Sequence, residues 1–309
     1  MDFLRLLESI RTPVMDTLMS AVTVLGDETV FMVLALAVFW CVSKRQGYYI
    51  LAVGFAGTVC NQWLKLIFRI PRPWVIDPNF SIVESARAAA AGYSFPSGHT
   101  QNIVGTMGAI AVSNRQRWVR ALCILFGLLV PFSRMYLGVH TPLDVGVSFL
   151  LALFLVAAMY PCFGSEDGFA RSIRPLSAAL LVFSLAYLAF ILFYPFPADI
   201  DAENLAAGAK NAYTLAGCIL GLMVVRWFDE TRLHFDTAAP LPGQLLKLLL
   251  GLALLLAVRA GLKPVLSALL HGAQLANLVR YFLMVVFAGC LWPMTFPFFA
   301  RVGAKRSRV

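Results

Sequence analysis

Two histidines occupy the positions best suited to covalent catalysis, and each has polar neighbours. His140 is followed four residues later by Asp144, and at the start of a helix such a carboxylate can orient an imidazole and stabilise its cationic form. The second ring nitrogen is then free to attack an electrophile. His99 stands in the polar stretch FPSGHTQN, where an imidazole can carry a proton near neutral pH. We interpret His140 as a nucleophile, Asp144 as its partner and His99 as an acid and base.

Three cations and one helix start provide groups that would hold an anion. Arg72 is flanked by prolines that stiffen its backbone, and its guanidinium fork matches phosphate oxygens, as does that of Arg134. Lys65 precedes Arg72 in KLIFRIPRP and adds a further charge. Ser97 and Gly98 precede an apolar run, so they open a helix whose free N–H groups attract anions. These five residues predict a phosphate-binding cradle.

Combined, these groups form a complete set for phosphoryl transfer through a phosphohistidine. The cations would neutralise the phosphate oxygens, His140 would attack in line, and His99 would protonate the leaving oxygen before acting as base for water. No step needs a metal or another cofactor, and the sequence has no carboxylate cluster to hold a metal. Each motif alone also has a structural alternative: a His–Asp contact, a polar helix cap, or cations that anchor span ends.

The surroundings of these residues are those of a membrane protein. Hydrophobic residues make up 60% of the 309 residues and charged residues 13%, about half the charged fraction of a soluble protein. Apolar segments of spanning length predict an all-α, polytopic membrane bundle of about nine transmembrane helices. We place the spans at 28–42, 47–68, 98–113, 118–138, 142–162, 174–194, 206–225, 244–261 and 275–298. The eighth span ends where Gly261, Lys263 and Pro264 interrupt the apolar run.

Cations recur in alternate connecting segments, which the positive-inside rule assigns to the cytoplasmic side. These segments contain Lys44 and Arg45; Arg115, Arg117 and Arg120; Arg171 and Arg174; Arg226 and Arg232; and Arg301, Lys305, Arg306 and Arg308. Nine spans then place the C-terminus in the cytoplasm, and the N-terminus and the acidic loop 195–205 outside. The three segments that carry the candidate groups also fall outside, against the charge rule. An anionic ligand would explain their cations.

Other features narrow the class of protein. Charged residues interrupt the apolar ones over residues 2–12, which predicts a short interfacial helix and not a cleavable signal peptide. The six cysteines have no metal-ligand spacing and fit small buried apolar residues. The net charge of +9 is carried at segment ends, which favours membrane orientation and argues against nucleic-acid binding.

The three candidate segments resemble the signatures of the type 2 phosphatidic acid phosphatase superfamily. The chain reads K-x6-RP from Lys65, PSGH from Pro96, and SR-x5-H-x3-D from Ser133, in that order. The resemblance implies a metal-independent phosphatase in which Lys65, Arg72, Ser97, Gly98 and Arg134 bind phosphate. It also implies that His140, His99 and Asp144 are catalytic. We expect an N-terminal interfacial segment over 1–27, a phosphatase core over 28–165 and a C-terminal membrane region over 166–309.

The C-terminal region carries no motif that assigns it a role. The long extension resembles the nine-span branch that contains sphingosine phosphate and glucose-6-phosphate phosphatases. Its charged residues Glu203, Lys210, Arg259 and Lys263 either line a cavity or mark the ends of spans. We favour the second interpretation, and the sequence leaves the role of the region and the oligomeric state open.

These observations favour a membrane phosphatase that acts on a lipid phosphate or diphosphate at the extracytoplasmic face. Undecaprenyl diphosphate in a bacterial cytoplasmic membrane is the first candidate substrate. The alternatives are a phosphatidate, phosphatidylglycerol-phosphate, sphingoid-base phosphate or sugar-phosphate phosphatase. A lipid phosphotransferase and a non-catalytic phospholipid transporter are further alternatives. Haloperoxidases share the signatures, but the predicted spans argue against that class.

Overall fold

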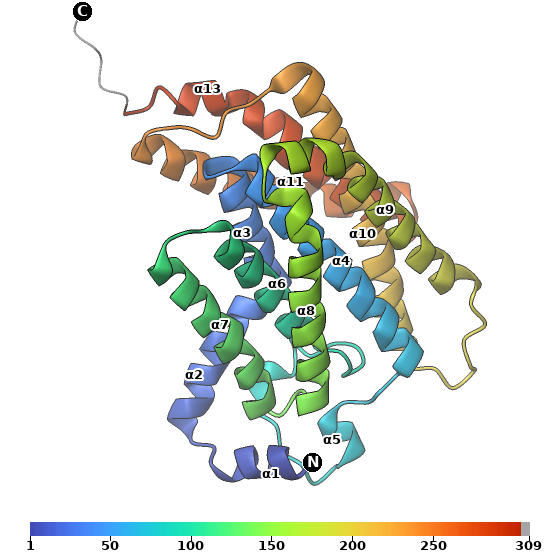
Figure 1. Cartoon of the computed structure of the whole chain (residues 1–309). Helices are drawn as coiled ribbons and strands as arrows, with labels where there is room; N and C mark the ends of the chain where they lie inside the picture. The colour runs from blue at the N-terminus through green and yellow to red at the C-terminus, as the bar shows by residue number, and fades with distance from the viewer. Residues whose placement is uncertain (304–309) are drawn as a thin grey trace, which may run out of the picture. The chain divides into compact units, whose positions relative to one another are not determined.

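The computed structural model describes residues 1–303, and its regular elements there are all helical (Figure 1). The predicted cytoplasmic cations Lys305, Arg306 and Arg308 lie outside the described residues. The α-helices are α1 (Asp2–Ser9), α2 (Pro13–Thr23), α3 (Glu28–Cys41), α4 (Lys44–Phe68), α5 (Pro73–Ile76), α6 (Gly98–Ser113), α7 (Arg117–Tyr136), α8 (Pro142–Phe163), α9 (Glu166–Phe193), α10 (Ala202–Phe228), α11 (Leu241–Leu269), α12 (Leu275–Val286) and α13 (Phe296–Phe299). Short 3₁₀ or π segments are η1 (Val24–Gly26), η2 (Glu84–Ala86), η3 (Asp229–Leu233), η4 (Phe287–Leu291) and η5 (Trp292–Thr295).

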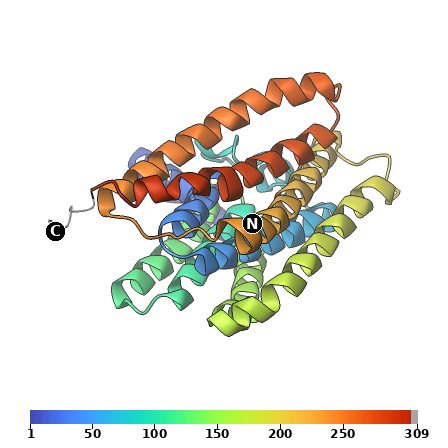
Figure 2. The same ribbon diagram turned by 90° about the horizontal axis from the view of Figure 1, so that it is seen from above.

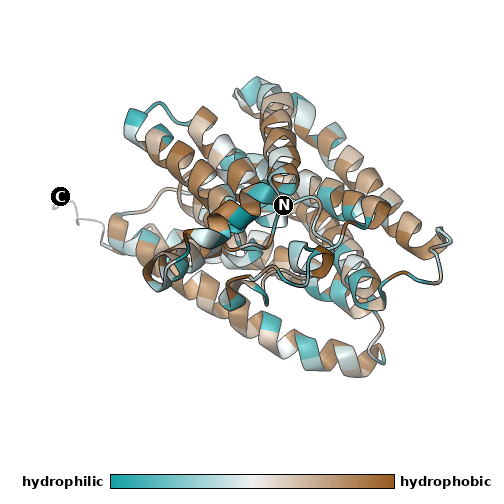
Figure 3. Ribbon diagram, turned by 90° about the horizontal axis from the view of Figure 1, so that it is seen from below, coloured by the Kyte–Doolittle hydropathy of each residue, from teal (hydrophilic) through white to brown (hydrophobic). Residues whose placement is uncertain are grey.

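The all-helical membrane fold is confirmed, whereas the count of nine spans is approximate. In the described part of the chain, seven helices are long and apolar enough to cross a membrane. An eighth span arises if α2 and α3 are joined across their 52° bend. The long helices are mainly brown in the hydropathy colouring of Figure 3. The chain is therefore an integral membrane protein with seven or eight candidate spans.

The predicted spans 28–42 and 98–113 are not among the seven helices, and the end of the eighth predicted span also differs. α6 has 16 residues, so it is about 24 Å long at 1.5 Å per residue, shorter than a hydrocarbon core of ~30 Å. The predicted end of the eighth span at residue 261 is wrong, because α11 continues to Leu269 with Pro264 inside it. Membrane helices tolerate an internal proline because neighbouring groups can satisfy the freed carbonyl.

The described chain divides into two compact units. The first unit contains Met1–Ala35, Tyr49–Ile173 and Phe193–Gly208, and the second contains Leu36–Tyr48, Arg174–Leu192 and the chain from Ala209 onward. The predicted domain boundaries after residues 27 and 165 stay a prediction. All the sequence-predicted site residues lie in the first unit.

In the first unit, α6 packs against both α7 and α8 (Figure 1). Ile103, Val130 and Ala152 meet in the core between them. The helix predicted near the N-terminus forms α1, which contacts α7 and buries Leu4 in a cluster with Phe80. This cluster anchors the segment between α5 and α6 to the end of α7. The loops that carry the candidate groups thus rest on packed helix ends.

In the second unit, α11 and α12 run side by side to a tight turn (Figure 2). α10 approaches α12 closely at Gly217, where a Cβ atom would lie 2.2 Å from the Leu278 carbonyl oxygen. Gly221 has the same function one turn later, because a Cβ there would lie 2.8 Å from Val285. Glycines at these positions let α10 pack closely against α12.

Candidate active site

His140 lies between α7 and α8, and the start of α8 supplies its carboxylate partner. Thr141 is the N-cap, and its hydroxyl accepts a hydrogen bond from the Asp144 amide at 3.2 Å. Asp144 Oδ2 accepts the Thr141 amide at 2.8 Å, which completes a capping box. The same Oδ2 lies 3.4 Å from His140 Nδ1. The spacing of His140 and Asp144 predicted a pair at a helix start. The capping box of Thr141 and Asp144 determines the position of the carboxylate in that pair.

Arg72 determines which ring nitrogen of His140 carries the proton. Its Nη1 lies 2.9 Å from His140 Nε2, and because a guanidinium has only donors, Nε2 must accept. The proton is then on Nδ1, which faces Asp144. A nucleophile that attacks through Nε2 requires this tautomer. Backbone carbonyls hold the guanidinium in place, those of Ala91, Gly92 and Val139, at 2.9, 3.0 and 3.0 Å.

The surroundings of His140 keep its ring neutral. The residue is 1% exposed, and burial lowers its pKa well below the ordinary value for histidine. The neighbouring cations Arg72, Arg134 and Lys65 lower that pKa further, because they repel a second positive charge. A neutral imidazole agrees with the tautomer that the Arg72 contact requires.

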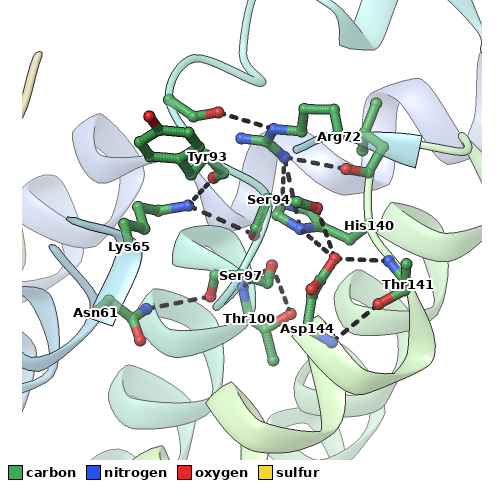
Figure 4. Close-up of polar contacts among 12 residues, drawn as sticks. Asn61, Lys65, Arg72, Tyr93, Ser94, Ser97, Thr100, His140, Thr141 and Asp144 are labelled. Atoms are coloured by element: carbon green, nitrogen blue, oxygen red, sulfur yellow. Dashed lines mark hydrogen bonds and ion pairs between the residues drawn. The ribbon is translucent and has the colours of Figure 1, made fainter. Parts of the chain in front are cut away.

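Lys65 connects α4 to the segment that leads into α6 (Figure 4). Its ammonium is buried and donates to the backbone carbonyls of Tyr93 and Ser94. The Ser94 hydroxyl donates to Asp144 Oδ2 at 2.6 Å. This chain of contacts joins the first predicted segment to the third through the second, and it brings Lys65 into the same polar cluster as His140.

Arg134 is the most deeply buried cation of the first unit. It is fully buried on the last turn of α7, and its Nη1 donates to Thr23 Oγ1 at 2.9 Å. Its Nε and Nη2 atoms are buried with no hydrogen-bond partner among the described residues. Neither Arg134, Lys65 nor Arg72 forms an ion pair with a carboxylate in residues 1–303. Uncompensated buried charge costs on the order of several kcal/mol, which an anionic ligand would offset.

His99 pairs with a carboxylate that carries no sequence motif. Asp27 follows η1, and its Oδ1 lies 2.8 Å from His99 Nε2. Gly26 allows this approach, because a Cβ atom there would lie 2.9 Å from the His99 Cβ. The bend between α2 and α3 thus supplies the second histidine with its own carboxylate.

Ser97 caps α6, and Gly98 leaves open space at its start. The Ser97 hydroxyl accepts hydrogen bonds from the Thr100 amide at 3.4 Å and the Thr100 hydroxyl at 3.0 Å. Asn61 of α4 donates to the Ser97 carbonyl at 3.3 Å. A Cβ atom on Gly98 would meet nothing within 4 Å. The fold therefore does not require glycine there, whereas a ligand close to the backbone would.

The structure brings together more residues than the motifs name. Sequence reasoning missed Thr23, Asp27, Asn61 and Ser94, since none lies at a signature position. The signal that was available for Asp27 is weak: a lone acidic residue beside a glycine in a bend. Among residues 1–303, no group of three or more His, Cys, Asp or Glu side chains is placed to hold a metal ion.

The helical membrane core brings the residues of the three signatures into one compact unit, with His140 beside Asp144 as predicted and His99 beside Asp27, which the signatures did not predict. The sequence matches the PAP2 superfamily over residues 45–167 and the PAP2 superfamily phosphatase transmembrane extension over residues 213–305. Together these matches cover more than half of the chain. The chain belongs to the PAP2 superfamily, and the predicted family is confirmed.

Similar proteins carry several substrate names. Undecaprenyl-diphosphatase BcrC of Bacillus subtilis is 34% identical over 113 residues, which is 37% of this chain and 55% of that protein. A probable sphingosine-1-phosphate phosphatase of Dictyostelium discoideum is 29% identical over 265 residues, 79% of this chain and 60% of that protein. Phosphatidylglycerophosphatase B of Bacillus subtilis is 27% identical over 161 residues, 47% of this chain and 74% of that protein.

The chain spans 55% and 60% of the lengths of the first two of these relatives. No solved structure matches the chain. All three relatives are named as phosphatases, and the substrates in their names differ.

Proposed function

We propose that the chain hydrolyses the phosphate of a membrane lipid through a phosphohistidine formed on His140. One observation supports this most strongly. Three buried cations without carboxylate partners in the described chain surround a histidine whose Nε2 is unprotonated. A phosphate group would neutralise the cations and present its phosphorus to that nitrogen.

The reaction follows from the two histidine–carboxylate pairs. His140 Nε2 attacks the terminal phosphorus while the bond from that phosphorus to the leaving oxygen breaks. The leaving oxygen belongs to the lipid alcohol in a monophosphate and to the lipid monophosphate in a diphosphate. Asp144 stabilises the charge that develops on the ring. His99 gives its proton to the leaving oxygen. Water then attacks the phosphohistidine, His99 removes the proton from that water, and the P–N bond breaks to release inorganic phosphate. Arg72, Arg134 and Lys65 bind the phosphate oxygens in both steps, with the Ser97 hydroxyl and the Gly98 amide.

Undecaprenyl diphosphate is our first candidate substrate. Of the three relatives named above, the one with that activity in its name has the highest identity to this chain, 34% over 113 residues. A sphingoid-base phosphate is the second candidate, because similarity to sphingosine-1-phosphate phosphatases extends over 79% of this chain and so reaches beyond the core. We place the site on the extracytoplasmic face, with the N-terminus outside and the C-terminus cytoplasmic, on the basis of the cationic loops.

A substrate panel with purified full-length protein in detergent tests this proposal. Phosphate release is measured with EDTA present for undecaprenyl diphosphate, sphingosine 1-phosphate, phosphatidate and glucose 6-phosphate. We expect turnover of at least one lipid substrate that does not depend on added metal. Binding without turnover for every substrate would indicate the transporter alternative. Transfer of labelled phosphate to an added acceptor lipid would indicate a phosphotransferase.

A further inference from the structure

The second unit contains a cavity of about 380 Å³ whose lining is rich in cations. It is lined by Lys210 of α10, by the last turns of α11 and by the start of α12. Four of its lining residues are basic, namely Lys210, Arg259, Lys263 and Arg280. Its volume falls in the range of small-molecule sites, roughly 300–1,000 Å³. Lys210, Arg259 and Lys263 therefore line a cavity, against the preferred interpretation that they only mark span ends.

The positive charge of this cavity is not balanced by neighbouring acids. No Asp or Glu is among its described lining residues. Lys210, Arg259 and Lys263 are exposed and have no ion-pair partner in residues 1–303. Arg280 is half-buried, and its Nε is buried with no hydrogen-bond partner among the described residues. Four converging cations without a carboxylate form a site that favours an anion.

The position of the cavity along the chain points to the membrane surface. Its lining includes Gly272 and Ala273 of the turn between α11 and α12. Lys210 is the ninth residue of α10, which begins at Ala202 within the acidic segment 195–205. The predicted topology puts that segment outside, where cations are disfavoured. These cations break the charge rule as those of the catalytic segments do.

Apolar residues beside the cations indicate what kind of anion fits. Leu256 lines the cavity and is 58% exposed, and Leu254 and Val265 are also exposed on α11. Only 11% of the most apolar window of α11 is buried inside the protein. A molecule with a charged head at the cavity and a hydrocarbon tail along α11 would contact both kinds of surface. A free phosphate ion would contact only the first kind.

We propose that this cavity binds the phosphate headgroup of an anionic membrane lipid without transforming it. Its described lining contains no histidine, cysteine or carboxylate, so it lacks a nucleophile paired with a base. The site is a lipid-binding site of the extension region, and it does not depend on the proposed hydrolysis.

Lipid binding by a cavity variant and a matched control variant tests the proposal. The cavity variant carries Arg259→Gln and Lys263→Gln. The control carries Arg232→Gln and Arg301→Gln, which removes two exposed cations of the same unit that do not line the cavity. Binding of phosphatidylglycerol and phosphatidylcholine to full-length protein is measured by native mass spectrometry. Phosphatidylglycerol is a phosphodiester, so phosphomonoester hydrolysis does not consume it.

We expect wild type to prefer phosphatidylglycerol, and the cavity variant to bind it about tenfold more weakly or worse. The control should stay within about twofold of wild type, with all three proteins eluting alike and melting at similar temperatures. Equal weakening in both variants would show diffuse surface charge and overturn the proposal. Inorganic phosphate that displaces the lipid completely at millimolar concentration would show a free-anion site and also overturn it. Hydrolysis of soluble p-nitrophenyl phosphate is measured separately, so failure of the proposed catalysis would not affect this readout.

Discussion

The two cation-rich regions differ in burial and in the groups beside the charges. In the first unit, Lys65, Arg72 and Arg134 are buried around His140. In the second unit, three of the four cavity cations are exposed, and no histidine is among the described lining residues. Buried unpaired cations cost free energy that only a tightly held anion recovers, whereas exposed cations bind reversibly at little cost to the fold. Buried cations can therefore support a reaction in the first unit, and exposed cations can support lipid binding in the second unit.

Removing the proposed nucleophile should have the largest effect on turnover and none on lipid binding in the second unit. We expect His140→Asn to reduce kcat by at least about 10⁴-fold, because the enzyme then has no group to accept the phosphoryl. Lipid binding at the cavity of the second unit should not change. Release of phosphate from the best panel substrate measures the effect, with His234→Asn as a matched control at an exposed histidine of the second unit. Near-normal turnover by His140→Asn would remove it as the nucleophile.

Asp144→Asn should separate the chemical role of this side chain from its structural role. An asparagine oxygen can still accept the Thr141 amide and cap α8, but it no longer stabilises a cationic imidazole. We expect kcat to fall by about 10² to 10⁴-fold while the melting temperature changes little. A large loss of stability with normal specific activity of the folded fraction would reverse this assignment.

Asp27→Asn tests whether the bend between α2 and α3 belongs to the site. The pair at 2.8 Å orients His99, so we expect kcat to fall about 10- to 100-fold. The pH profile of kcat should shift as well, because a carboxylate stabilises the protonated imidazole. Asp16→Asn, which changes another carboxylate of the same N-terminal segment, is the control. Equal effects of the two substitutions would indicate a structural role only.

Gly98→Ala should affect substrate binding more than folding. The Cβ enters space that no protein atom within 4 Å occupies, and it would press on a phosphate held at the start of α6. We expect KM to rise about tenfold, the cost of an interaction near 1.4 kcal/mol, with an unchanged melting temperature. Gly127→Ala, on α7, also has no atom within 4 Å of the added Cβ and is the control.

The smallest expected effect concerns stability at acid pH without substrate. The pKa of His140 is held below its ordinary value by burial, so the unfolded chain binds the proton first as the pH falls. The free energy of unfolding contributed by the neutral ring is full above about pH 6.5 and decreases below it. We expect the melting temperature to fall by a few degrees more between pH 7.5 and 5.5 in wild type than in His140→Asn. Parallel curves for the two proteins would contradict a depressed pKa.

Sequence reasoning named residues that the fold gathers in the first unit, but it did not predict their contacts. The signatures place Lys65, Arg72, His99, Arg134 and His140 in order along the chain, and the fold brings them into the first unit. Their partners could not be predicted in the same way. Arg72 and Lys65 are held by backbone carbonyls, which every residue has, so no residue type reveals them.

The remaining differences arise from packing that acts at long range. Asp27 meets His99 only because η1 packs on the start of α6. A hydropathy window treats α6 as a full span, although its 16 residues are too few to cross alone. Arg259 and Lys263 resembled markers of a span end because Pro264 suggested a break, and the continuation of α11 is what makes them cavity residues.

The capping box of α8 has a consequence for how the protein would lose function under stress. Asp144 holds the first turn of α8 and faces the His140 ring through one oxygen atom. If that turn frays, the carboxylate leaves His140 before any global unfolding begins. Hydrogen exchange at the Thr141 and Asp144 amides would then report the fraction of molecules that are competent to react. The maximum specific activity would then decrease with rising temperature as the first turn of α8 becomes less ordered.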